Sequence, residues 1–451
     1  MKKVLTEAQQ TIEKHKMLKG VRKLIVAFSS GPDSVCLLDA LNTLYGDKID
    51  IHLVYVNHGL RPNRILKAEE NLTKIYALKY HLKYKIIKVK INKTKIGIEA
   101  AARAARHNVL LNYLKQISGQ RIALGHNLDD VLETFLMNLL RGSGTRGLKS
   151  IPAVRRLFIR PLINLKKEEI LRFLKNRKLP YTVDKTNIKL KFRRNLLRHK
   201  IIPQLIRINP ELHETIKRGI EILKQDDEYL EEQATKAYKN VARKEKNDIT
   251  LDLKMILRYN PSIISRIVMK VIKDLRGDLA GYESKHVDGI IGLKDKVSGK
   301  KINLPKGLYA QREYNTVVIG TAKPVQTIEL AVKPEGSALI LGNLRFRTRV
   351  VSSFDLKKLK SNCEVFDLAK IKRPLLIRNR RLGDYIDTKI GKKKLKKVFN
   401  ELKIPLRRRS EAMMLCDQKS ILWILGMVRA FRGFIDKKTK KILVGEFEYI
   451  D

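Results

Sequence analysis

The feature that most constrains the fold of this chain is a strand, turn and helix pattern at residues 24–42, LIVAFSSGPDSVCLLDALN. A β-branched apolar run ends at the small-residue turn Ser29–Ser34, and apolar residues at helical spacing follow from Val35. This layout directs backbone N–H groups and the positive end of a helix dipole at one point, which is typical of a phosphate site. The turn lacks the G-x-x-x-x-G-K-[ST] pattern of a P-loop. An ordinary connection between a strand and a helix is the alternative for this segment taken alone.

Strand-like runs recur along the first part of the chain, about 30 residues apart, with helical patterns between them. They lie at 24–28, 51–56, 84–90, 121–124 and 157–160. This spacing predicts βαβ units and hence an N-terminal doubly wound parallel sheet of the α/β class. Ligands bind such sheets at the carboxyl ends of the strands. Three polar segments are expected there: Ser29–Ser34, Asn57–Arg61 and Gly125–Asn127.

The regular alternation ends near Pro210, which divides the chain into an N-terminal part and a different remainder. We predict a catalytic α/β domain at 1–210 and a mainly helical middle domain at 211–325, closed by a β-hairpin at 301–319. A connecting β segment is expected at 326–372. A small, basic α/β C-terminal domain is expected at 373–451.

Charge points to a polyanionic partner. Lysine and arginine number 95 against 46 acidic residues, a formal net charge of +49. Nucleic acid is the natural partner for such an excess, although a proteome rich in lysine is an alternative cause. No apolar run approaches the roughly 18 residues of a membrane span, and the first residues lack the apolar core of a signal peptide. The widely spaced Cys36, Cys363 and Cys416 predict a reducing, cytoplasmic setting without disulfides.

Two acidic residues stand where a strand gives way to a helix. Asp130 and Glu133 are three apart, so they share one helical face near the helix start. They either bind a cation, Mg²⁺ or a substrate ammonium, or only cap the helix and complement its dipole. The glycine-rich segment 141–147 contains G-x-G-x-x-G, but it follows a predicted helix rather than a strand. We therefore expect a loop near the same pocket, with its arginines facing phosphates, and not a dinucleotide fingerprint.

Two basic segments complete the set of candidate sites. Arg194 and Arg198, four residues apart, predict a cationic stripe suited to a carboxylate or phosphate. Residues 389–409 carry ten basic residues and one acid, and predict an amphipathic helix. Its buried face is expected to hold Leu395, Val398, Phe399 and Leu402, and its basic face Lys393, Lys394, Lys396 and Lys397. Contact of this face and of Arg407–Arg409 with nucleic-acid phosphates is favoured over a merely solvated surface.

Taken in order, these motifs resemble the bacterial tRNA(Ile)-lysidine synthetase family, whose catalytic domain is of the PP-loop ATP pyrophosphatase type. The turn Ser29–Ser34 is similar to the S-G-G-x-D-S loop of those pyrophosphatases. The resemblance covers nearly the whole chain and is strongest at 24–210. The matching segments are VNHGLRPN (56–63), EAAARAARHNVL (99–110), GHNLDDVLETFLMNLLRGSGTRGL (125–148), RPL (160–162), DKTN (184–187), RRNLLRHKIIPQL (193–205), LPKGLYAQREY (304–314) and IRNRRLGDY (377–385).

The resemblance implies an ATP-dependent ligase. Enzymes of this family attach L-lysine to C2 of the wobble cytidine in isoleucine tRNA with a CAU anticodon, which changes codon reading from AUG to AUA. ATP adenylates the C2 oxygen and releases pyrophosphate. The ε-amine of lysine then attacks, and AMP leaves. Positioning and charge neutralisation should dominate such chemistry.

The resemblance also implies roles for particular residues. Asp33, Asp130, Glu133 and Arg198 are the expected catalytic residues, and the last three of them are expected to hold the substrate lysine. Asp33 is the expected Mg²⁺ ligand. The expected ATP-binding residues are Ser29, Ser30, Gly31, Pro32, Asp33, Ser34, His58 and Arg103. The expected tRNA-binding residues are Arg194, Lys393, Lys394, Lys397, Arg407 and Arg409.

One departure from the family concerns Ser30, because the family loop usually has glycine there. If this residue must adopt a positive φ, serine costs roughly 1–2 kcal/mol. Two other functions stay open: a PP-loop tRNA thiolation enzyme, which usually needs clustered cysteines, and a non-enzymatic RNA-binding protein with a degenerate nucleotide loop. Cys36 lies at helical spacing among apolar residues, which predicts packing. The oligomeric state is also open, a homodimer included.

Overall fold

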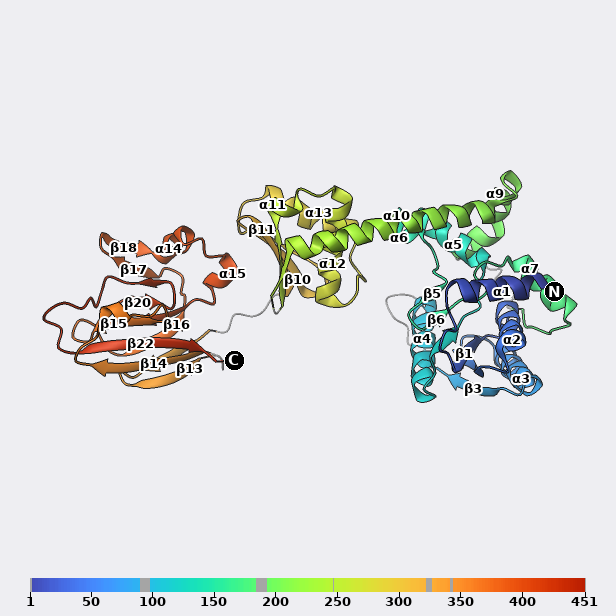
Figure 1. Ribbon diagram of the computed structural model, residues 1–451, viewed down its shortest axis with the longest axis horizontal. Coiled ribbons are helices and arrows are strands. Elements are labelled where there is room, and N and C mark those ends of the chain that lie inside the picture. The colour runs from blue at the N-terminus through green and yellow to red at the C-terminus, as the bar shows by residue number, and fades with distance from the viewer. Residues whose placement is uncertain are drawn as a thin grey trace. The chain divides into compact units, whose positions relative to one another are not determined.

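The computed structural model describes residues 2–89, 98–183, 193–245, 247–321, 327–340 and 344–450, without the side chains of 98–100, 193 and 358. The DKTN motif at 184–187 lies outside the described residues. The chain divides into two compact units, Met1–Tyr229 and Leu230–Asp451 (Figure 1). This division falls inside one long helix, whereas the predicted boundary lies at residue 210.

A six-stranded sheet organises the first unit, in the order β3-β2-β1-β4-β6-β5. All neighbours pair in parallel except β5 and β6, which are antiparallel. The predicted parallel sheet is therefore confirmed. Chain order reverses on either side of β1, so the crevice between the carboxyl ends of β1 and β4 is the expected ligand site. The strands are β1 (Lys23–Phe28), β2 (Asp50–Asn57), β3 (Lys83–Lys88), β4 (Arg121–Ala123), β5 (Val154–Arg155) and β6 (Phe158–Ile159).

Helices cover both faces of this sheet, as a doubly wound fold requires. Figure 1 shows α4 on one side and α1, α2 and α3 on the other. Two separate apolar cores result: Leu37 and Phe173 belong to one of them, and Leu110 with Ile122 to the other. The helices are α1 (Lys2–Lys14), α2 (Pro32–Tyr45), α3 (Asn63–Lys79), α4 (Ile98–Gln116), α5 (Leu128–Leu139), α6 (Thr145–Leu148) and α7 (Lys167–Asn176).

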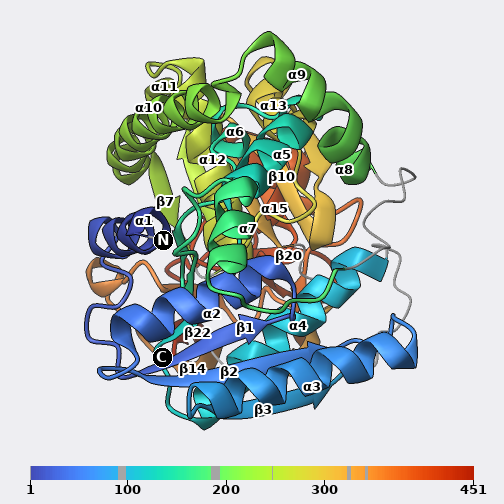
Figure 2. The same cartoon turned by 90° about the vertical axis from the view of Figure 1, so that its right-hand side faces the viewer.

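Short helical segments and then the long helix α10 follow, and the short segments lie beside α5 (Figure 2). Leu132 of α5 packs against Leu197 and Ile202 in one small apolar cluster. A π-helical turn, which is rare and often found at functional sites, interrupts this run. The elements are α8 (Arg193–Leu196), the π-helix η2 (Leu197–Ile201), α9 (Ile202–Ile208) and α10 (Leu212–Val241).

The second unit begins with a five-stranded antiparallel sheet of order β7-β8-β11-β10-β9, packed against helices. The predicted hairpin is confirmed as β10 (Leu308–Glu313) and β11 (Thr316–Thr321). The strands β7 (Ala242–Lys244) and β8 (Asp248–Asp252) were not predicted, because they lie in a segment whose pattern is helical. The other elements are α11 (Leu253–Ile256), α12 (Pro261–Arg276), α13 (Ser284–Ile291), η3 (Gly292–Asp295), β9 (Lys301–Asn303) and η4 (Pro305–Gly307).

Two further sheets complete the second unit, and they share one apolar core around Phe346, Phe366 and Trp423. Strands from 326–372 pair with strands from 373–451, for example β12 with β16 and β14 with β22. The predicted boundary at residue 372 therefore divides a continuous structure, and 326–372 is not a separate connector. The strands are β12 (Glu329–Val332), β13 (Gly336–Ile340), β14 (Leu344–Val351), β15 (Cys363–Asp367), β16 (Leu375–Asn379), β17 (Tyr385–Thr388), β18 (Gly391–Lys394), β19 (Met413–Cys416), β20 (Ile421–Ile424), β21 (Val428–Arg429) and β22 (Ile442–Tyr449).

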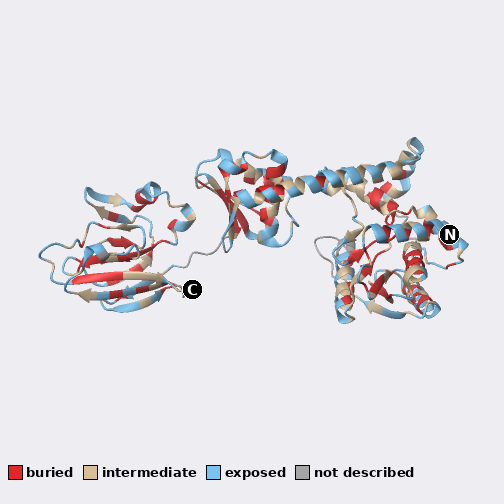
Figure 3. Ribbon diagram, viewed as in Figure 1, coloured by how far each residue is buried: buried red, intermediate tan, exposed pale blue. Residues whose placement is uncertain are grey.

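Three short helices lie between these strands: η5 (Leu356–Lys358), α14 (Leu395–Glu401) and α15 (Leu406–Arg409). The amphipathic helix predicted over 389–409 is thus shorter than expected, because Gly391–Lys394 pairs with β17 as a strand. Leu395, Val398 and Phe399 are buried as predicted, whereas Leu402 lies beyond the helix end and is 43% exposed. Figure 3 shows that buried residues line the strands and the inner helix faces within each unit.

Candidate active site

The turn Ser29–Ser34 is braced by its own side chains. The hydroxyl of Ser34 accepts a hydrogen bond from the Ser29 backbone N–H (3.1 Å) and donates one to the Gly31 carbonyl (2.9 Å). Helix α2 begins directly after Gly31, with Pro32 in its first turn and Asp33 beside it. Pro32 has no N–H, and the N–H groups of Ser34 and Val35 donate to the Gly31 carbonyl (both 3.1 Å). The turn therefore presents the positive end of the α2 dipole at the carboxyl end of β1.

Ser30 adopts the left-handed conformation that its position was suspected to require, with a φ of 59°. Its side chain is fully buried. The hydroxyl donates to the Glu69 carbonyl in α3 (3.0 Å), and the Ser30 carbonyl accepts from the Thr182 N–H (2.8 Å). A hydrogen bond contributes about 0.5–1.5 kcal/mol, so the serine hydroxyl offsets much of the backbone cost of roughly 1–2 kcal/mol. Serine is therefore accommodated without opening the turn.

The end of β4 packs directly against this turn. A Cβ atom on Gly125 would lie 3.0 Å from the Asp33 carbonyl carbon and oxygen and 3.2 Å from the Ser34 nitrogen. Only glycine allows that approach without displacing backbone. Two residues later, the side-chain amide of Asn127 donates to Oδ1 of Asp33 (3.0 Å). Two of the three polar segments predicted at this edge are thus in direct contact.

Asn127 also joins the turn to the acidic face of α5. Its side chain accepts from the Asp130 N–H (3.0 Å), and its backbone N–H donates to the Asp130 carboxylate (3.1 Å). Asn127 is therefore the N-cap of α5, and Asp130 is the third helical residue of the same capping box, so the simpler interpretation of Asp130 holds in part. Asp130 also forms an ion pair with Arg194, so it does more than stabilise the start of the helix.

Four predicted residues form one charged cluster. Arg194 Nη2 lies 2.7 Å from Asp130 Oδ1, and Arg194 Nε lies 2.7 Å from Glu133 Oε2. Arg198 pairs with Glu133 through Nε and, at 2.9 Å, through Nη2. The side chain of Glu133 is 1% exposed. The residues predicted to hold lysine are thus brought together, and Arg194, predicted for tRNA, stands among them.

Burial and charge act in opposite directions on the pKa values of this cluster. Burial raises the pKa of Asp130, more than the nearby Arg194 lowers it. Burial lowers the pKa of Arg198, but the hydrogen bond and charge of Glu133, with Asp130 and Asp33, raise it above its ordinary value. The cluster contains two carboxylates and two guanidinium groups, so it can exchange partners with a zwitterion.

Several arginines surround His126 and His58, two histidines of the predicted polar segments. Arg160 is buried, and it donates from Nε to His126 Nδ1 (3.2 Å) and from Nη1 to the Pro152 carbonyl (2.8 Å). Burial lowers the pKa of His126 to about 3, and the positive charges of Arg160 and Arg103 contribute to this shift. Burial likewise lowers the pKa of His58 to about 4, and the positive charges of Arg106 and Arg61 contribute to this shift. The predicted Arg103 thus lies within an arginine-rich region around neutral histidines.

His58 offers a specific place for a ligand. Its Nδ1 atom is buried and has no hydrogen-bond partner among the residues that the structure describes. A buried polar atom without a partner is costly unless a ligand or water satisfies it. The sequence pointed to His58 and Arg103 but not to Arg106 and Arg160. The matching segment RPL, which begins with Arg160, was the available signal.

Lys167 is another site residue that the sequence patterns did not predict. Its ammonium lies 2.7 Å from each carboxylate oxygen of Asp33, and its backbone N–H donates to Asp129 (2.7 Å). Lys167 begins α7, just beyond β6. Because β6 is parallel to β4, its carboxyl end meets the same edge of the sheet, and this was the signal that could have found it.

The other predicted basic residues lie in the second unit. Lys393 and Lys394 end β18, Lys397 lies in α14, and Lys393 pairs with Glu401 (2.6 Å). Arg407 pairs with Asp248 (2.8 Å), Glu245 (3.2 Å) and Glu313 (3.2 Å). Arg409 is 5% exposed. Both arginines are thus held by protein partners, Arg409 by donating to the Ile404 carbonyl (2.7 Å).

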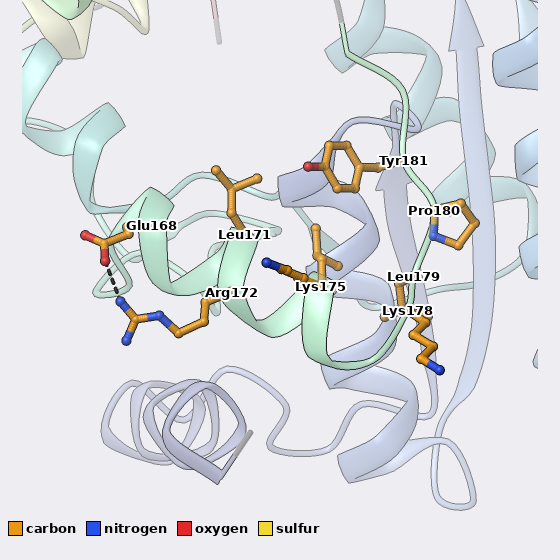
Figure 4. A pocket seen from close by; sticks show the side chains of 9 residues that line it. Glu168, Leu171, Arg172, Lys175, Lys178, Leu179, Pro180 and Tyr181 are labelled. Carbon is orange, nitrogen blue, oxygen red and sulfur yellow. Dashed lines mark hydrogen bonds and ion pairs between the residues drawn. The ribbon is translucent and has the colours of Figure 1, made fainter.

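Three further features of the structure concern a metal cluster, a cavity and membrane-spanning helices. Among the described residues, no three histidine, cysteine or acidic side chains gather closely enough to bind a metal ion. A hollow of about 620 Å³ lies along α7, with Leu171 and Tyr181 in its lining (Figure 4), but none of the predicted site residues lines it. None of the described helices combines the length and apolar character needed to cross a bilayer.

Family models and curated relatives match most of the chain. A model for a PP-loop domain matches residues 2–205, and one for the TilS substrate C-terminal domain matches 375–444. A tRNA(Ile)-lysidine synthase of Caldanaerobacter subterraneus subsp. tengcongensis is 32% identical over 455 residues, covering 98% of this chain and 97% of the relative. Those of Clostridioides difficile (29%) and Clostridium acetobutylicum (30%) each cover 98% of both chains. The chain therefore belongs to the tRNA(Ile)-lysidine synthase family.

Proposed function

We propose that this protein ligates L-lysine to C2 of the wobble cytidine in isoleucine tRNA with a CAU anticodon, converting ATP to AMP and pyrophosphate. The modification changes codon reading from AUG to AUA. One observation carries the proposal beyond family membership. Asn127 bonds at once to Asp33 of the phosphate turn and to Asp130 of the charged cluster. A nucleotide site and a candidate amino-acid site are therefore built against each other.

The first step is adenylation of the cytidine C2 oxygen. The turn Ser29–Ser34, with the start of α2, is suited to hold the phosphates, because its N–H groups and helix dipole favour negative charge. His58 and Arg103 complete the ATP site. The C2 oxygen attacks the α-phosphorus and pyrophosphate leaves. Fixed positive groups that need no rearrangement stabilise the charge that develops in this step.

The second step brings lysine to the activated base. Asp130 and Glu133 provide carboxylates for ammonium groups, and Arg198 provides a guanidinium for the lysine carboxylate. In the structure these side chains satisfy one another. Lysine binding therefore exchanges internal ion pairs for equivalent pairs with the substrate, which limits the cost of desolvating charge. The ε-ammonium then loses a proton to solvent, and the free amine attacks C2, so the C2–O bond breaks and AMP leaves.

We assign Mg²⁺ to Asp33 and the ATP phosphates. Mg²⁺ usually binds through one or two carboxylates together with substrate phosphates, so a single carboxylate is sufficient. The fit is supported by the carboxylate of Asp33, which is partly exposed and already holds a cationic group, the ammonium of Lys167. When bound, Mg²⁺ neutralises phosphate charge. The residues of the chain itself hold the turn and the carboxylate in place.

For tRNA, we retain Lys393, Lys394 and Lys397 as backbone contacts. Arg407 and Arg409 are less suited, because phosphate contact requires each to give up partners within the protein. Arg194 is better placed to act with the charged cluster than on the tRNA backbone. A cytoplasmic location belongs to the proposal, and a homodimer is the assembly to test by light scattering.

The thiolation alternative is disfavoured by the three cysteines, all of which are buried and unpaired. Burial raises the pKa of Cys36 above its ordinary value, and it raises the pKa of Cys416 to about 11. Sulfur transfer requires accessible thiolates, and burial of this kind suppresses them. The alternative of a non-enzymatic protein rested on Ser30, which the turn accommodates.

An assay of pyrophosphate release tests the proposal. Because the adenylation step needs only ATP and isoleucine tRNA with a CAU anticodon, release without lysine should stop once the bound tRNA is adenylated. Continued release is expected only when lysine is also present. If sulfide replaces lysine as the required co-substrate, the thiolation function is correct. If no combination releases pyrophosphate although the tRNA binds, the non-enzymatic function is correct.

A further inference from the structure

Lys167 is a charged residue in contact with the phosphate turn to which neither the motifs nor the proposed chemistry assigns a role. Its Nζ lies 2.7 Å from both carboxylate oxygens of Asp33, across 134 residues of sequence. The side chains of Lys167 and Asp33 are 34% and 29% exposed. The pair is therefore neither a sealed core contact nor a free surface ion pair.

The backbone and the side chain of Lys167 are held in different ways. Its N–H donates to Asp129 Oδ2 (2.7 Å), and the other oxygen of Asp129 contacts His213 Nε2 (3.3 Å). The start of α7 is thereby attached to the first turn of α5. The side chain, in contrast, depends on Asp33 through its ammonium. A long aliphatic side chain on a fixed backbone can redirect its charged end over a short distance.

The charge at this point calls for a cation. Asp33 lies in the first turn of α2, where the proposed function places the phosphates of ATP. A carboxylate there repels phosphate unless positive charge stands between them, and the ammonium of Lys167 would supply such charge in addition to the proposed Mg²⁺. An ammonium has three donors, so it can keep one bond to Asp33 and give others to phosphate oxygens.

We propose that Lys167 is a phosphate-binding residue of the adenylation site, its ammonium bridging the Asp33 carboxylate and the phosphates of ATP. The proposal rests on the proposed function, because it presumes that ATP binds at this turn. A purely structural role is the competing explanation. In that case Lys167 only neutralises Asp33 and never touches the nucleotide.

A double-mutant cycle separates these two roles. The probe is α,β-methylene-ATP, whose binding to the full chain is measured by calorimetry without tRNA or lysine, so no turnover occurs. The variants are Lys167→Ala, Asp33→Asn and the double variant. Lys175→Ala is the matched control, because it removes an exposed lysine from the same helix. Lys167→Arg tests whether charge alone is enough.

Loss of a charged hydrogen bond to phosphate is expected to weaken binding about tenfold or more in Lys167→Ala, and Lys175→Ala should leave it unchanged. The decisive comparison is made in the Asp33→Asn background, where no carboxylate needs neutralising. If the double variant binds the analogue more weakly than Asp33→Asn does, Lys167 contacts the phosphates. If the double variant and Asp33→Asn bind the analogue equally well, the proposal is overturned. Circular dichroism confirms that each variant is folded.

The outcomes also distinguish this proposal from the proposed function. If the wild-type protein does not bind the analogue, the ATP site is not at this turn, and both the role of Lys167 and the proposed function are overturned. If the wild type binds the analogue and Lys167→Ala binds it equally well, only the role of Lys167 is overturned. Retention of most of the affinity by Lys167→Arg, with loss in Lys167→Ala, supports a cation at the phosphates.

Discussion

Nη2 of Arg194 lies 2.7 Å from Oδ1 of Asp130, so an arginine assigned to tRNA from the sequence stands inside the proposed lysine site. The same side chain reaches Glu133 through Nε. With Arg198 also paired to Glu133, each carboxylate has an internal cation before any substrate arrives. Binding of lysine is then a replacement of partners rather than the filling of an empty charged pocket.

Glu133→Gln should raise the KM for lysine about tenfold or more, while the KM for ATP changes little. The variant removes the charge that an ammonium needs and also weakens Arg198, its neighbour in the cluster. Steady-state kinetics with each substrate varied in turn measures both constants. Glu168→Gln is the control, because Glu168 is an exposed residue whose ion pair with Arg172 lies on the surface. A selective rise in the KM for ATP would instead assign Glu133 to the nucleotide.

Asp33→Asn should nearly abolish AMP formation while the fold is retained. Asparagine keeps the size of the side chain and a possible bond to Asn127, but it cannot hold Lys167 or Mg²⁺ through charge. Thin-layer separation of labelled AMP from ATP measures turnover, and circular dichroism measures folding. Turnover like that of the wild type would remove Asp33 from the mechanism.

Ser30→Ala should open the turn more than Ser30→Gly. Alanine keeps a Cβ at a φ of 59° and loses the hydroxyl bond to Glu69, whereas glycine loses the bond and relieves the backbone cost. The expected difference is about 1–2 kcal/mol in local opening. Hydrogen–deuterium exchange of peptides from β1 and α2 measures it. Faster exchange in Ser30→Gly would contradict this explanation of the serine.

His58 and His126 should stay neutral throughout the physiological pH range. Their pKa values, about 4 and about 3, lie below the value of about 6.5 for an unfolded histidine. The unfolded state therefore binds more protons as pH falls below about 6.5, and these two residues then lower the stability of the folded protein. NMR of the imidazole carbons should show no titration of either residue between pH 5 and 8. In urea, all nine histidines should titrate near 6.5.

Changing Lys393, Lys394 and Lys397 together to alanine should weaken tRNA binding and make its salt dependence shallower. The log–log slope should fall by about 0.7–0.9 for each phosphate that the variant no longer neutralises. Filter binding across a salt series measures this. The matched control changes Lys14, Lys19 and Lys48, which are exposed; Lys19 and Lys48 precede β1 and β2 at the amino end of the sheet. Equal slopes in wild type and triple variant would reject a role of these lysines in binding tRNA phosphates.

Local patterns in the sequence were enough to predict β1, α2 and the parallel sheet, because each strand and helix there is read from its own residues. They failed where pairing partners are remote. The strand β8 is short and charged, and it exists because β11 pairs with it. In the same way, Lys393 and Lys394 form a strand with β17 rather than the first turn of a helix.

In the candidate site, too, local patterns predicted individual residues but not their remote partners. Asp130 and Glu133 were identifiable because they lie one helical turn apart. Their pairing with Arg194 and Arg198 depends on how α8 and η2 pack against α5, which spacing alone does not encode. Local patterns could not predict the role of Lys167, because its partner Asp33 is 134 residues away. The possible positive φ of Ser30 followed from the glycine that the family loop usually has there, but the compensating bond to α3 could be found only from the fold.

The most direct test of the central claim is mass spectrometry of the wobble nucleoside after reaction. Isoleucine tRNA with a CAU anticodon is incubated with the protein, ATP and isotope-labelled lysine, then digested to nucleosides. The account predicts a cytidine carrying one labelled lysine at the wobble position, formed in a one-to-one ratio with AMP, and none with Asp33→Asn. AMP release with an unmodified wobble cytidine, or a cytidine carrying sulfur instead, would contradict it.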